Sequence, residues 1–346
     1  MDGVSGIRIA MSGGVDSAVA AMLVKQQGYD CIGITMVTDH DTASGDVLDA
    51  AAVCKILGFK HEVVDLTDEF RRCVIDYFVN EYLAGRTPNP CVACNKTIKF
   101  GLLADYDAGW GYATGHYARC EYDQASGRYL LRAAVCREKD QSYFLYSLTQ
   151  RQLSGTLFPM GELTKEEARS MAAEAGLPNF ARHDSQDICF IPDGDYAGFI
   201  ERLTGSTGRP GDFVDMQGRV LGTHRGQLHY TIGQRRGLGL ALPEPLYVGG
   251  RDMEANQIIL CTNAELFSNE CTASDVSFCS IDEPREGTEL RCSAKIRYAH
   301  KPQPAHAVWE KGLLHVFFDE PQRAITPGQS VVLYDEDVVL GGGVIL

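Results

Sequence analysis

The stretch IRIAMSGGVDSAVAAMLVKQQG (residues 7–28) decides the fold of the first half of the chain. A short apolar run ends in SGGVDS (residues 12–17), and apolar residues then recur at helical spacing until Gly28. This order predicts a buried strand, a tight loop and a helix. The backbone N–H groups and the dipole at the start of such a helix favour a bound phosphate.

The same alternation continues after Gly28. Strands are expected over residues 31–37, 62–66 and 110–114, and helices over residues 47–57, 68–82 and from residue 96 onward. Strands that alternate with helices predict a parallel sheet. Thr164 and Glu167 have the spacing of a capping box and start a further helix that ends by Gly176. We therefore expect an α/β, Rossmann-like domain over residues 1–200 with a helical appendage.

The second half of the chain differs in composition and pattern: it is rich in glycine and in short stretches that predict strands. It predicts a small, mostly-β central domain over residues 201–265. The stretches at residues 291–300, 307–318 and 330–346 are typical of consecutive hairpins. They predict a C-terminal β-barrel over residues 266–346.

Length and charge bound the possible functions. A chain of 346 residues is long enough for two or three domains. Its 46 acidic against 32 basic residues give a net charge of −14, which argues against a broad, non-specific grip on polyanions. A local basic face is still possible, because residues 201–240 hold six arginines against three acids. The arginines are Arg202, Arg209, Arg219, Arg225, Arg235 and Arg236.

No apolar run reaches the roughly 18 to 20 residues of a membrane span, and the amino end lacks the features of a signal peptide. We expect a cytoplasmic protein with no membrane partner. Most of its 12 cysteines should then be reduced.

The loop SGGVDS carries the first candidate chemistry. Its two glycines let the backbone come close to a phosphate, and Ser12 and Ser17 add hydroxyl donors. Asp16 could hold a Mg²⁺ ion that bridges phosphates. The chain has no GxxxxGK[ST] motif, which excludes a Walker-type NTPase. The alternative is a plain Gly-Gly turn whose serines and Asp16 only cap the helix.

Three cysteines carry the second candidate chemistry. Cys91 and Cys94 follow Pro88-Asn89-Pro90, so we expect them on a constrained loop just before a helix, where thiolates are stabilised. No second Cys-x-x-Cys pair exists, which argues against a zinc site with four cysteine ligands. Cys189 lies in another polar stretch, HDSQDICFIPDGD (residues 183–195).

Together these stretches resemble those of the tRNA-specific 2-thiouridylases of the bacterial MnmA type. SGGVDS alone resembles the PP-loop of ATP pyrophosphatases, which cleave ATP between the α and β phosphates. The likeness also covers NPCVACNKTIKF (89–100), ATGHY (113–117), SQDICFIPDGDY (185–196), HYTIGQRRGLG (229–239) and TPGQ (326–329). It implies that the first domain is a PP-loop domain of the adenine nucleotide alpha hydrolase type.

The resemblance also implies roles for single residues. The residues expected to bind ATP are Ala10, Met11, Ser12, Gly13, Gly14, Val15, Asp16, Ser17, Met36 and Gly115. Cys94 would be the nucleophile, and Cys189 would carry a persulfide. The stretch expected at the target base is Asn89, Pro90 and Cys91. The other expected tRNA contacts are His116, Lys139, Asp140, Gln141, Arg297, Tyr298 and Gln329.

The implied reaction is ATP-dependent 2-thiolation of the wobble uridine, U34, of tRNA. ATP, with Mg²⁺, adenylates the C2 oxygen, and sulfur then displaces AMP. The implied partners are the anticodon stem-loop of tRNA and a protein that donates persulfide or sulfide. In the persulfide route Cys94 and Cys189 end as a disulfide, which a reductant must reopen.

The chain departs from the familiar family pattern at Cys91, where an Asp is usual. Cys91, Cys94 and Cys189 could instead hold a [4Fe–4S] cluster with one open iron, and the three-cysteine set favours this alternative. The persulfide route stays open beside it. A PP-loop synthetase or amidotransferase would explain SGGVDS but not the cysteines. A non-catalytic RNA-binding protein would explain the β-rich half but not the intact loop.

Overall fold

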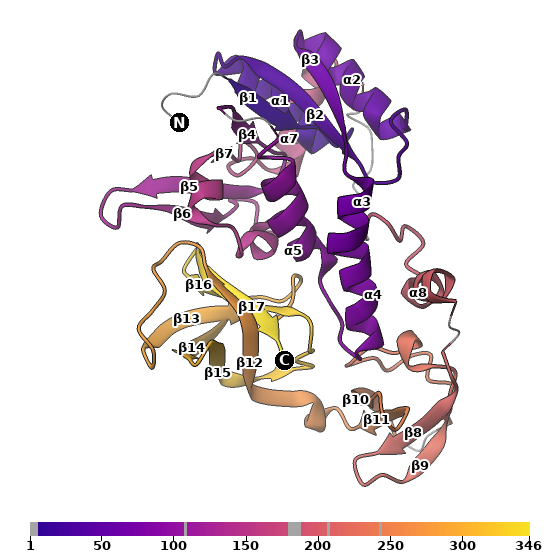
Figure 1. The fold of residues 1–346 in the computed structure, drawn as a ribbon. Coiled ribbons are helices and arrows are strands. Elements are labelled where there is room, and N and C mark those ends of the chain that lie inside the picture. The colour runs from indigo at the N-terminus through magenta and orange to yellow at the C-terminus, as the bar shows by residue number, and fades with distance from the viewer. Residues whose placement is uncertain (1–5, 107–108, 179–187, 206–207, 242–243) are drawn as a thin grey trace.

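The computed structural model describes residues 6–106, 109–178, 188–205, 208–241 and 244–346. The chain passes from an α/β unit, through a small sheet, to a barrel in which the carboxyl terminus lies (Figure 1). Across the described residues, no helix has both the length and the apolar character needed to span a bilayer.

The α/β unit contains the expected parallel sheet, in the order β3-β2-β1-β4-β7. Its strands are β1 (Ile7–Ala10), β2 (Cys31–Val37), β3 (Lys60–Asp65), β4 (Gly111–Ala113) and β7 (Thr156–Leu157). The helices α1 (Val15–Gln26) and α2 (Gly45–Leu57) pack on it, and α7 (Lys165–Glu174) packs on α1. The chain builds outward from β1 to β3 and then crosses to β4. Parallel sheets bind ligands where the strand order reverses in this way, here at the carboxyl ends of β1 and β4.

Two helical segments extend from this sheet. The first joins α3 (Thr67–Phe70), the π-helix η1 (Arg71–Ile75) and α4 (Asp76–Leu83). The second joins α5 (Pro90–Cys94) to the π-helix η2 (Asn95–Leu102).

The start of the second helix corrects the sequence prediction, which put Cys91 and Cys94 on a loop and began the helix near residue 96. The helix begins at Pro90 instead. Asn89 caps it by accepting a hydrogen bond from the backbone N–H of Cys91 at 3.2 Å, and proline suits the first helical position. Both thiols therefore lie on the helix itself.

A hairpin and two short helices connect the α/β unit to the barrel. They are β5 (Ala118–Asp123), β6 (Arg128–Ala133), η3 (Ser142–Leu145) and α6 (Gln150–Ser154). The hairpin extends the barrel sheet, because Arg132 of β6 pairs with Val338. Asp337 also forms ion pairs with both Arg119 and Arg132. The sequence analysis did not predict this hairpin.

The central sheet has the order β10-β11-β8-β9 and follows α8 (Tyr196–Thr204). Its elements are β8 (Gly211–Asp215), β9 (Val220–His224), η4 (Gln227–His229), β10 (Tyr247–Asp252) and β11 (Gln257–Cys261). Phe213, Tyr230 and Val248 lie in its own small core.

The C-terminal strands close into the expected barrel. They are β12 (Phe267–Phe278), β13 (Glu289–Lys295), β14 (Gln303–Glu310), β15 (Leu313–Arg323), β16 (Ser330–Asp335) and β17 (Val338–Ile345), preceded by η5 (Ala264–Leu266). Closure follows because β12 pairs with both β15 and β17. The predicted β-barrel is thus confirmed, whereas the domain limits near residues 200 and 265 stay predictions.

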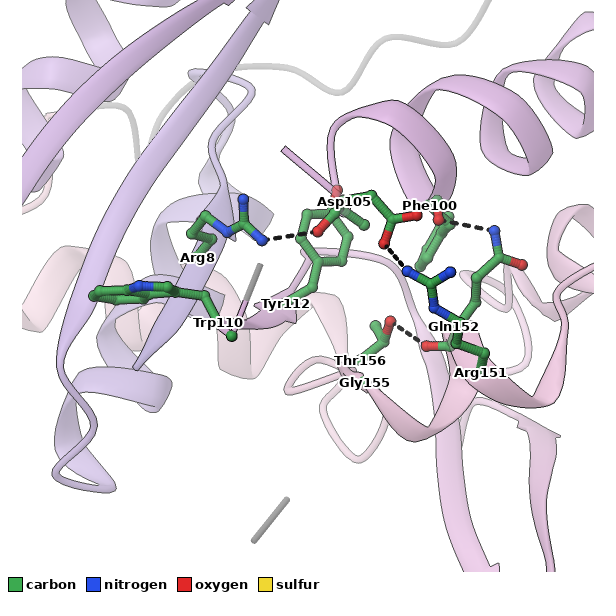
Figure 2. A pocket seen from close by; sticks show the side chains of 11 residues that line it. Arg8, Phe100, Asp105, Trp110, Tyr112, Arg151, Gln152, Gly155 and Thr156 are labelled. Carbon is green, nitrogen blue, oxygen red and sulfur yellow. Dashed lines mark hydrogen bonds and ion pairs between the residues drawn. The ribbon is translucent and has the colours of Figure 1, made fainter. Parts of the chain in front are cut away.

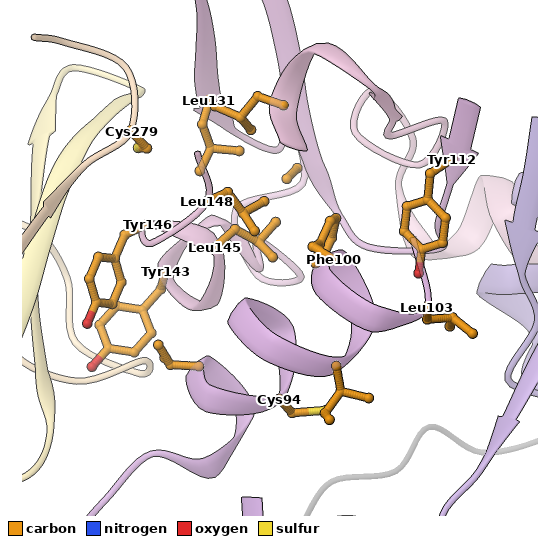
Figure 3. Close-up of a cluster of buried hydrophobic side chains, with 14 of the residues drawn as sticks. Cys94, Phe100, Leu103, Tyr112, Leu131, Tyr143, Leu145, Tyr146, Leu148 and Cys279 are labelled. Atoms are coloured by element: carbon orange, nitrogen blue, oxygen red, sulfur yellow. The ribbon is translucent and has the colours of Figure 1, made fainter. Parts of the chain in front are cut away.

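A shared hydrophobic cluster joins the α/β unit to the barrel (Figure 3). It runs from Phe100 and Tyr112 through Tyr143 to Cys279, and it includes Cys94. Tyr143 is fully buried, and its hydroxyl donates to the backbone carbonyl of Ser330 at 2.8 Å.

We predict that Tyr143→Ala lowers the free energy of unfolding by about 3–5 kcal/mol, because it opens a cavity in this cluster and breaks the bond to Ser330. Tyr122→Ala is the control, since Tyr122 is 54% exposed, and it should cost less than about 1 kcal/mol. Urea unfolding followed by circular dichroism measures both. Equal losses would contradict a stabilising role for the junction.

Candidate active site

The loop between β1 and α1 has the geometry of an anion site. Gly13 has φ +72°, and a Cβ atom there would lie 2.7 Å from the carbonyl oxygen of Asp46. Only glycine fits this position. The hydroxyl of Ser17 donates to the carbonyl of Gly14 at 2.9 Å and accepts from the N–H of Ser12 at 3.2 Å. These bonds fix the loop over the start of α1.

The loop after β4 packs directly against this helix start. A Cβ atom on Gly115 would lie 2.8 Å from the backbone nitrogen of Ser17 and 2.9 Å from the carbonyl carbon of Asp16. Real Cβ atoms do not approach backbone so closely, and neither neighbour can turn away. The absence of a side chain at Gly115 therefore allows the loops that follow β1 and β4 to pack directly against each other.

The residues predicted to bind ATP meet at one edge of the sheet. Ala10 pairs in register with Ile34, and Met36 follows two residues later near the end of β2. Gly115 follows β4 on the other side of β1. The predicted set thus lies at the carboxyl ends of β1, β2 and β4, beside the reversal in strand order.

Asp16 has two partners that sequence reasoning missed. The ammonium of Lys165, the first residue of α7, donates to Oδ1 at 2.7 Å and to Oδ2 at 2.9 Å. The hydroxyl of Tyr117 also donates to Oδ1, at 2.9 Å. No local pattern marks either residue, because 149 positions separate Lys165 from Asp16.

Asp16 also fits the Mg²⁺ ion expected with ATP. Mg²⁺ needs only one or two carboxylates besides phosphate oxygens and water. The side chain of Asp16 keeps 30% exposure, so an ion can reach it.

The three candidate cysteines differ in exposure. Cys91 and Cys189 are exposed, whereas Cys94 is buried with 6% exposure. Cys189 is anchored by its neighbour Phe190, whose ring lies 5.5 Å from that of Phe78 and 5.4 Å from that of Phe199. An aromatic cluster thus holds the chain at Cys189 against α4 and α8.

Electrostatics links the three thiols to one another and to a lysine. The pKa of Cys94 is raised to about 11, mainly by burial. The charge of Lys99 opposes this rise, and Cys189 and Cys91 add to it. Desolvation likewise raises the pKa of Cys91 and of Cys189, and Lys99 opposes both shifts. Lys99 is therefore the cation that the three thiols share. The sequence analysis did not single it out.

These thiols do not fit a preformed iron–sulfur site. Among the residues that the structure describes, which include Cys91, Cys94 and Cys189, no group of three His, Cys, Asp or Glu side chains is placed to hold a metal ion.

His116 lies between the helix that carries Cys91 and Cys94, here called the thiol helix (residues 90–102), and the phosphate loop (residues 12–17). Its ring lies 5.5 Å from that of Phe100 on η2, and Nδ1 lies 2.7 Å from the hydroxyl of Thr114. Burial, with the nearby charge of Lys99, holds its pKa well below the usual value, so the ring is neutral at pH 7. The loop of residues 114–116 therefore touches α1 through Gly115 and η2 through His116.

Three of the side chains predicted to contact tRNA form hydrogen bonds within the protein instead. Asp140 is buried and accepts hydrogen bonds from the N–H groups of Ala134 and Ser142. Gln141 accepts a hydrogen bond from the N–H of Tyr117 at 2.9 Å. Gln329 donates to the carbonyl of Thr87 at 2.8 Å. These side chains shape the loops beside the site.

Other predicted tRNA contacts remain accessible. Tyr298 is 38% exposed, and its ring lies 4.5 Å from that of Phe144. Lys139 is partly exposed. Arg297 donates to the carbonyl of Arg323 at 3.1 Å.

A separate hollow of about 380 Å³ lies near Arg8, Trp110 and Tyr112 (Figure 2). An ion pair between Asp105 and Arg151, at 2.9 Å, lies along its wall. None of the predicted site residues lines this hollow.

Comparison with known families covers nearly the whole chain. Residues 5–193 match the model described as tRNA methyl transferase HUP domain. Residues 197–262 match the tRNA methyl transferase PRC-barrel domain, and residues 268–345 match the Aminomethyltransferase beta-barrel domain.

The sequence is also similar to curated proteins and to solved structures. It is 48% identical to tRNA-specific 2-thiouridylase MnmA 2 of Thermoanaerobacter sp. (strain X514), over 98% of this chain and 97% of that protein. It is 48% identical to tRNA-specific 2-thiouridylase MnmA of Clostridioides difficile (strain 630), over 98% of this chain and 97% of that protein. NMN synthetase from Francisella tularensis is 17% identical, with a TM-score of 0.36, over 59% of this chain and 78% of that one. From the family model and these relatives, the chain belongs to the MnmA family of tRNA-specific 2-thiouridylases.

Proposed function

We propose that this chain thiolates C2 of the wobble uridine, U34, of tRNA in the cytoplasm, using ATP to activate the C2 oxygen and a persulfide on Cys189 to supply sulfur. The observation that carries the proposal is the loop of residues 114–116. Gly115 packs on the helix start that would bind phosphates, and His116 packs on the helix that follows Cys94. One loop thus ties the activating site to the sulfur-transfer site.

In the first step, the C2 oxygen of uridine attacks the α-phosphorus of ATP, and pyrophosphate leaves. The N–H groups at the start of α1 and the hydroxyls of Ser12 and Ser17 would stabilise the charge on the phosphates. Mg²⁺, when bound at Asp16, would neutralise part of that charge.

In the second step, the terminal sulfur of the Cys189 persulfide bonds to C2, and AMP leaves with the former C2 oxygen. The thiolate of Cys94 then attacks the Sγ atom of Cys189 and breaks its bond to the transferred sulfur. That sulfur remains on C2 as the thiocarbonyl. The product disulfide between Cys94 and Cys189 is reduced by a dithiol, and a persulfide-donating protein reloads Cys189.

The surface of the central domain supports a tRNA substrate. Arg209, Arg225, Arg235 and Arg236 are exposed, and within the described ranges none of them is ion-paired with an acid. Such arginines suit contacts to phosphates that position RNA. The exposed ring of Tyr298 suits stacking on a base. We propose that the anticodon stem-loop lies across these residues.

The direct test incubates unmodified tRNA anaerobically with the protein, ATP, Mg²⁺ and a persulfide source, followed by mass spectrometry of the nucleosides. We expect 2-thiouridine only when ATP is present. Cys94→Ser and Cys189→Ser should abolish the product, whereas Cys91→Ser should keep most of the activity, because the persulfide route does not use Cys91. Full activity of iron-free Cys91→Ser would exclude a cluster, whereas loss of both bound iron and activity in Cys91→Ser would favour one. Absence of 2-thiouridine from the wild type would reject the proposed reaction.

Gly115→Ala should weaken ATP binding by about 5- to 100-fold, because its Cβ atom would push back the first turn of α1. The matched control is Gly45→Ala, since a Cβ atom at Gly45 meets nothing within 4 Å. Isothermal titration calorimetry with a non-hydrolysable ATP analogue measures both. Unchanged affinity in Gly115→Ala would place the nucleotide elsewhere.

Lys99→Met should move the rising limb of the pH–rate profile to higher pH. The charge of Lys99 lowers the pKa of Cys94, which stands at about 11, so its removal raises that pKa further and leaves less thiolate at any lower pH. We expect sulfur transfer at pH 8 to slow by about 2- to 5-fold. Single-turnover rates between pH 7 and 10 measure this, with exposed Lys55→Met as the control. A profile that does not move would show that Lys99 does not act on the nucleophile.

A further inference from the structure

A guanidinium group is enclosed where the central domain meets the segment before the thiol helix. Arg251 lies in β10, and its Nη2 atom donates to the hydroxyl of Thr87 at 3.1 Å. Across the part of the chain that the structure describes, its Nε and Nη1 atoms are shielded from solvent and have no hydrogen-bond partner. Burial lowers the pKa of Arg251, and the nearby hydroxyl of Tyr82 opposes that shift.

This arrangement is unfavourable for stability. A buried donor without an acceptor destabilises the folded state, and most of all when it carries charge. Nε and Nη1 hold most of the N–H donors of the guanidinium of Arg251. An apolar side chain of similar length would avoid this penalty. Stability alone therefore does not explain an arginine here, and its bond to Thr87 indicates what it does.

The bond completes a clamp around Thr87. The backbone N–H of Thr87 donates to the carbonyl of Pro327 at 2.8 Å, and its own carbonyl accepts from the side chain of Gln329 at 2.8 Å. Both partners belong to the barrel. The hydroxyl is bonded to Arg251 of the central domain. The barrel thus holds the backbone of this residue, and the central domain holds its side chain.

The conformation at Thr87 is passed on to the thiol helix within a few residues. Pro88 has a fixed φ and restricts the residue before it, so the segment between Thr87 and Asn89 is stiff. Asn89 then caps the helix by accepting from the N–H of Cys91 at 3.2 Å. A change at Thr87 would therefore turn the cap and the first helical turn, which carries Cys91 and Cys94.

We propose that Arg251 is a positioning residue, which holds the hydroxyl of Thr87 from the central domain and thereby sets the direction of the cap and first turn of the thiol helix. The inference rests on the proposed function. A planar guanidinium on a long stem suits the task, because it presents its donors in a fixed direction across a domain boundary. Residues that serve a site in this way often do so at the expense of stability. Replacing Arg251 should thus lower activity without lowering stability.

The first test compares Arg251→Met with the wild type. Methionine fills a similar space but carries neither a charge nor a donor. At saturating tRNA and ATP we expect kcat for thiolation to fall by about 5- to 30-fold, because the thiols are misaligned. The KM for ATP should change less than about twofold, and the urea midpoint of unfolding should stay the same or rise. A variant that does not fold, or that unfolds at lower urea, would overturn the proposal, because the arginine would then serve stability.

The second test asks whether Arg251 acts through Thr87. Thr87→Val removes the hydroxyl and keeps a similar shape, so the double variant should lose no more activity than either single variant. Arg251→Lys should recover part of kcat, because its ammonium can still donate to Thr87. Arg291→Met is the matched control, since the side chain of Arg291 is 64% exposed on the barrel, and it should change neither kcat nor stability. Additive losses in the double variant would overturn the proposal.

A third readout does not depend on turnover. Cys91 is exposed, so its rate of alkylation by iodoacetamide, measured by mass spectrometry of its peptide, reports the placement of the first helical turn. We expect this rate to change by about threefold or more in Arg251→Met and in Thr87→Val, with no further change in the double variant. An unchanged rate in Arg251→Met would overturn the positioning role.

Failure of this role and failure of the proposed thiolation are distinguishable. Wild-type protein that forms no 2-thiouridine, with the alkylation rates as expected, would reject the reaction and support the positioning role. Wild-type protein that forms 2-thiouridine, with kcat and alkylation unchanged in Arg251→Met, would reject the positioning role alone.

Discussion

The close contact of Gly115 with the first turn of α1 is the constraint on which the site depends. Because no side chain separates Gly115 from Ser17, the ends of β1 and β4 share one surface. The next residue, His116, continues to Phe100 on the helix that carries the thiols. Any side chain at position 115 would collide with the backbone of Asp16 and Ser17 at the first turn of α1.

The barrel and the central domain also act on the thiol helix, through the segment just before it. Thr87 donates its N–H to the carbonyl of Pro327 and receives hydrogen bonds from Gln329 and from Arg251 of β10. A Cβ atom on Gly328 would lie 2.8 Å from the backbone nitrogen of Thr87, so the barrel turn fits tightly there. Two domains therefore hold the residues that precede Asn89 and the Cys91 helix.

Sequence predicted the parts of this arrangement that depend on local pattern. The parallel sheet, the capping box of Thr164 and the barrel strands follow from periodicity and turn residues, and the structure confirms them. The helix start at Pro90 was missed, although Asn89 and Pro90 are a cap and a first residue, because the two prolines also suit a loop. The pairing of Asp16 with Lys165 and the close packing of Gly115 on the backbone of Ser17 could not be predicted. Both depend on which distant segments the fold brings together.

The burial of Cys94 sets a balance between protection and reactivity. Its pKa of about 11 leaves the thiol almost fully protonated at neutral pH, which protects it from oxidation because the thiolate is the reactive form. A thiol of high pKa is also the stronger nucleophile once its proton is lost. The charge of Lys99 lowers the cost of that loss without removing the protection. Cys91 and Cys189 are exposed, whereas Cys94 is buried, so the three thiols differ in how readily solvent reaches them.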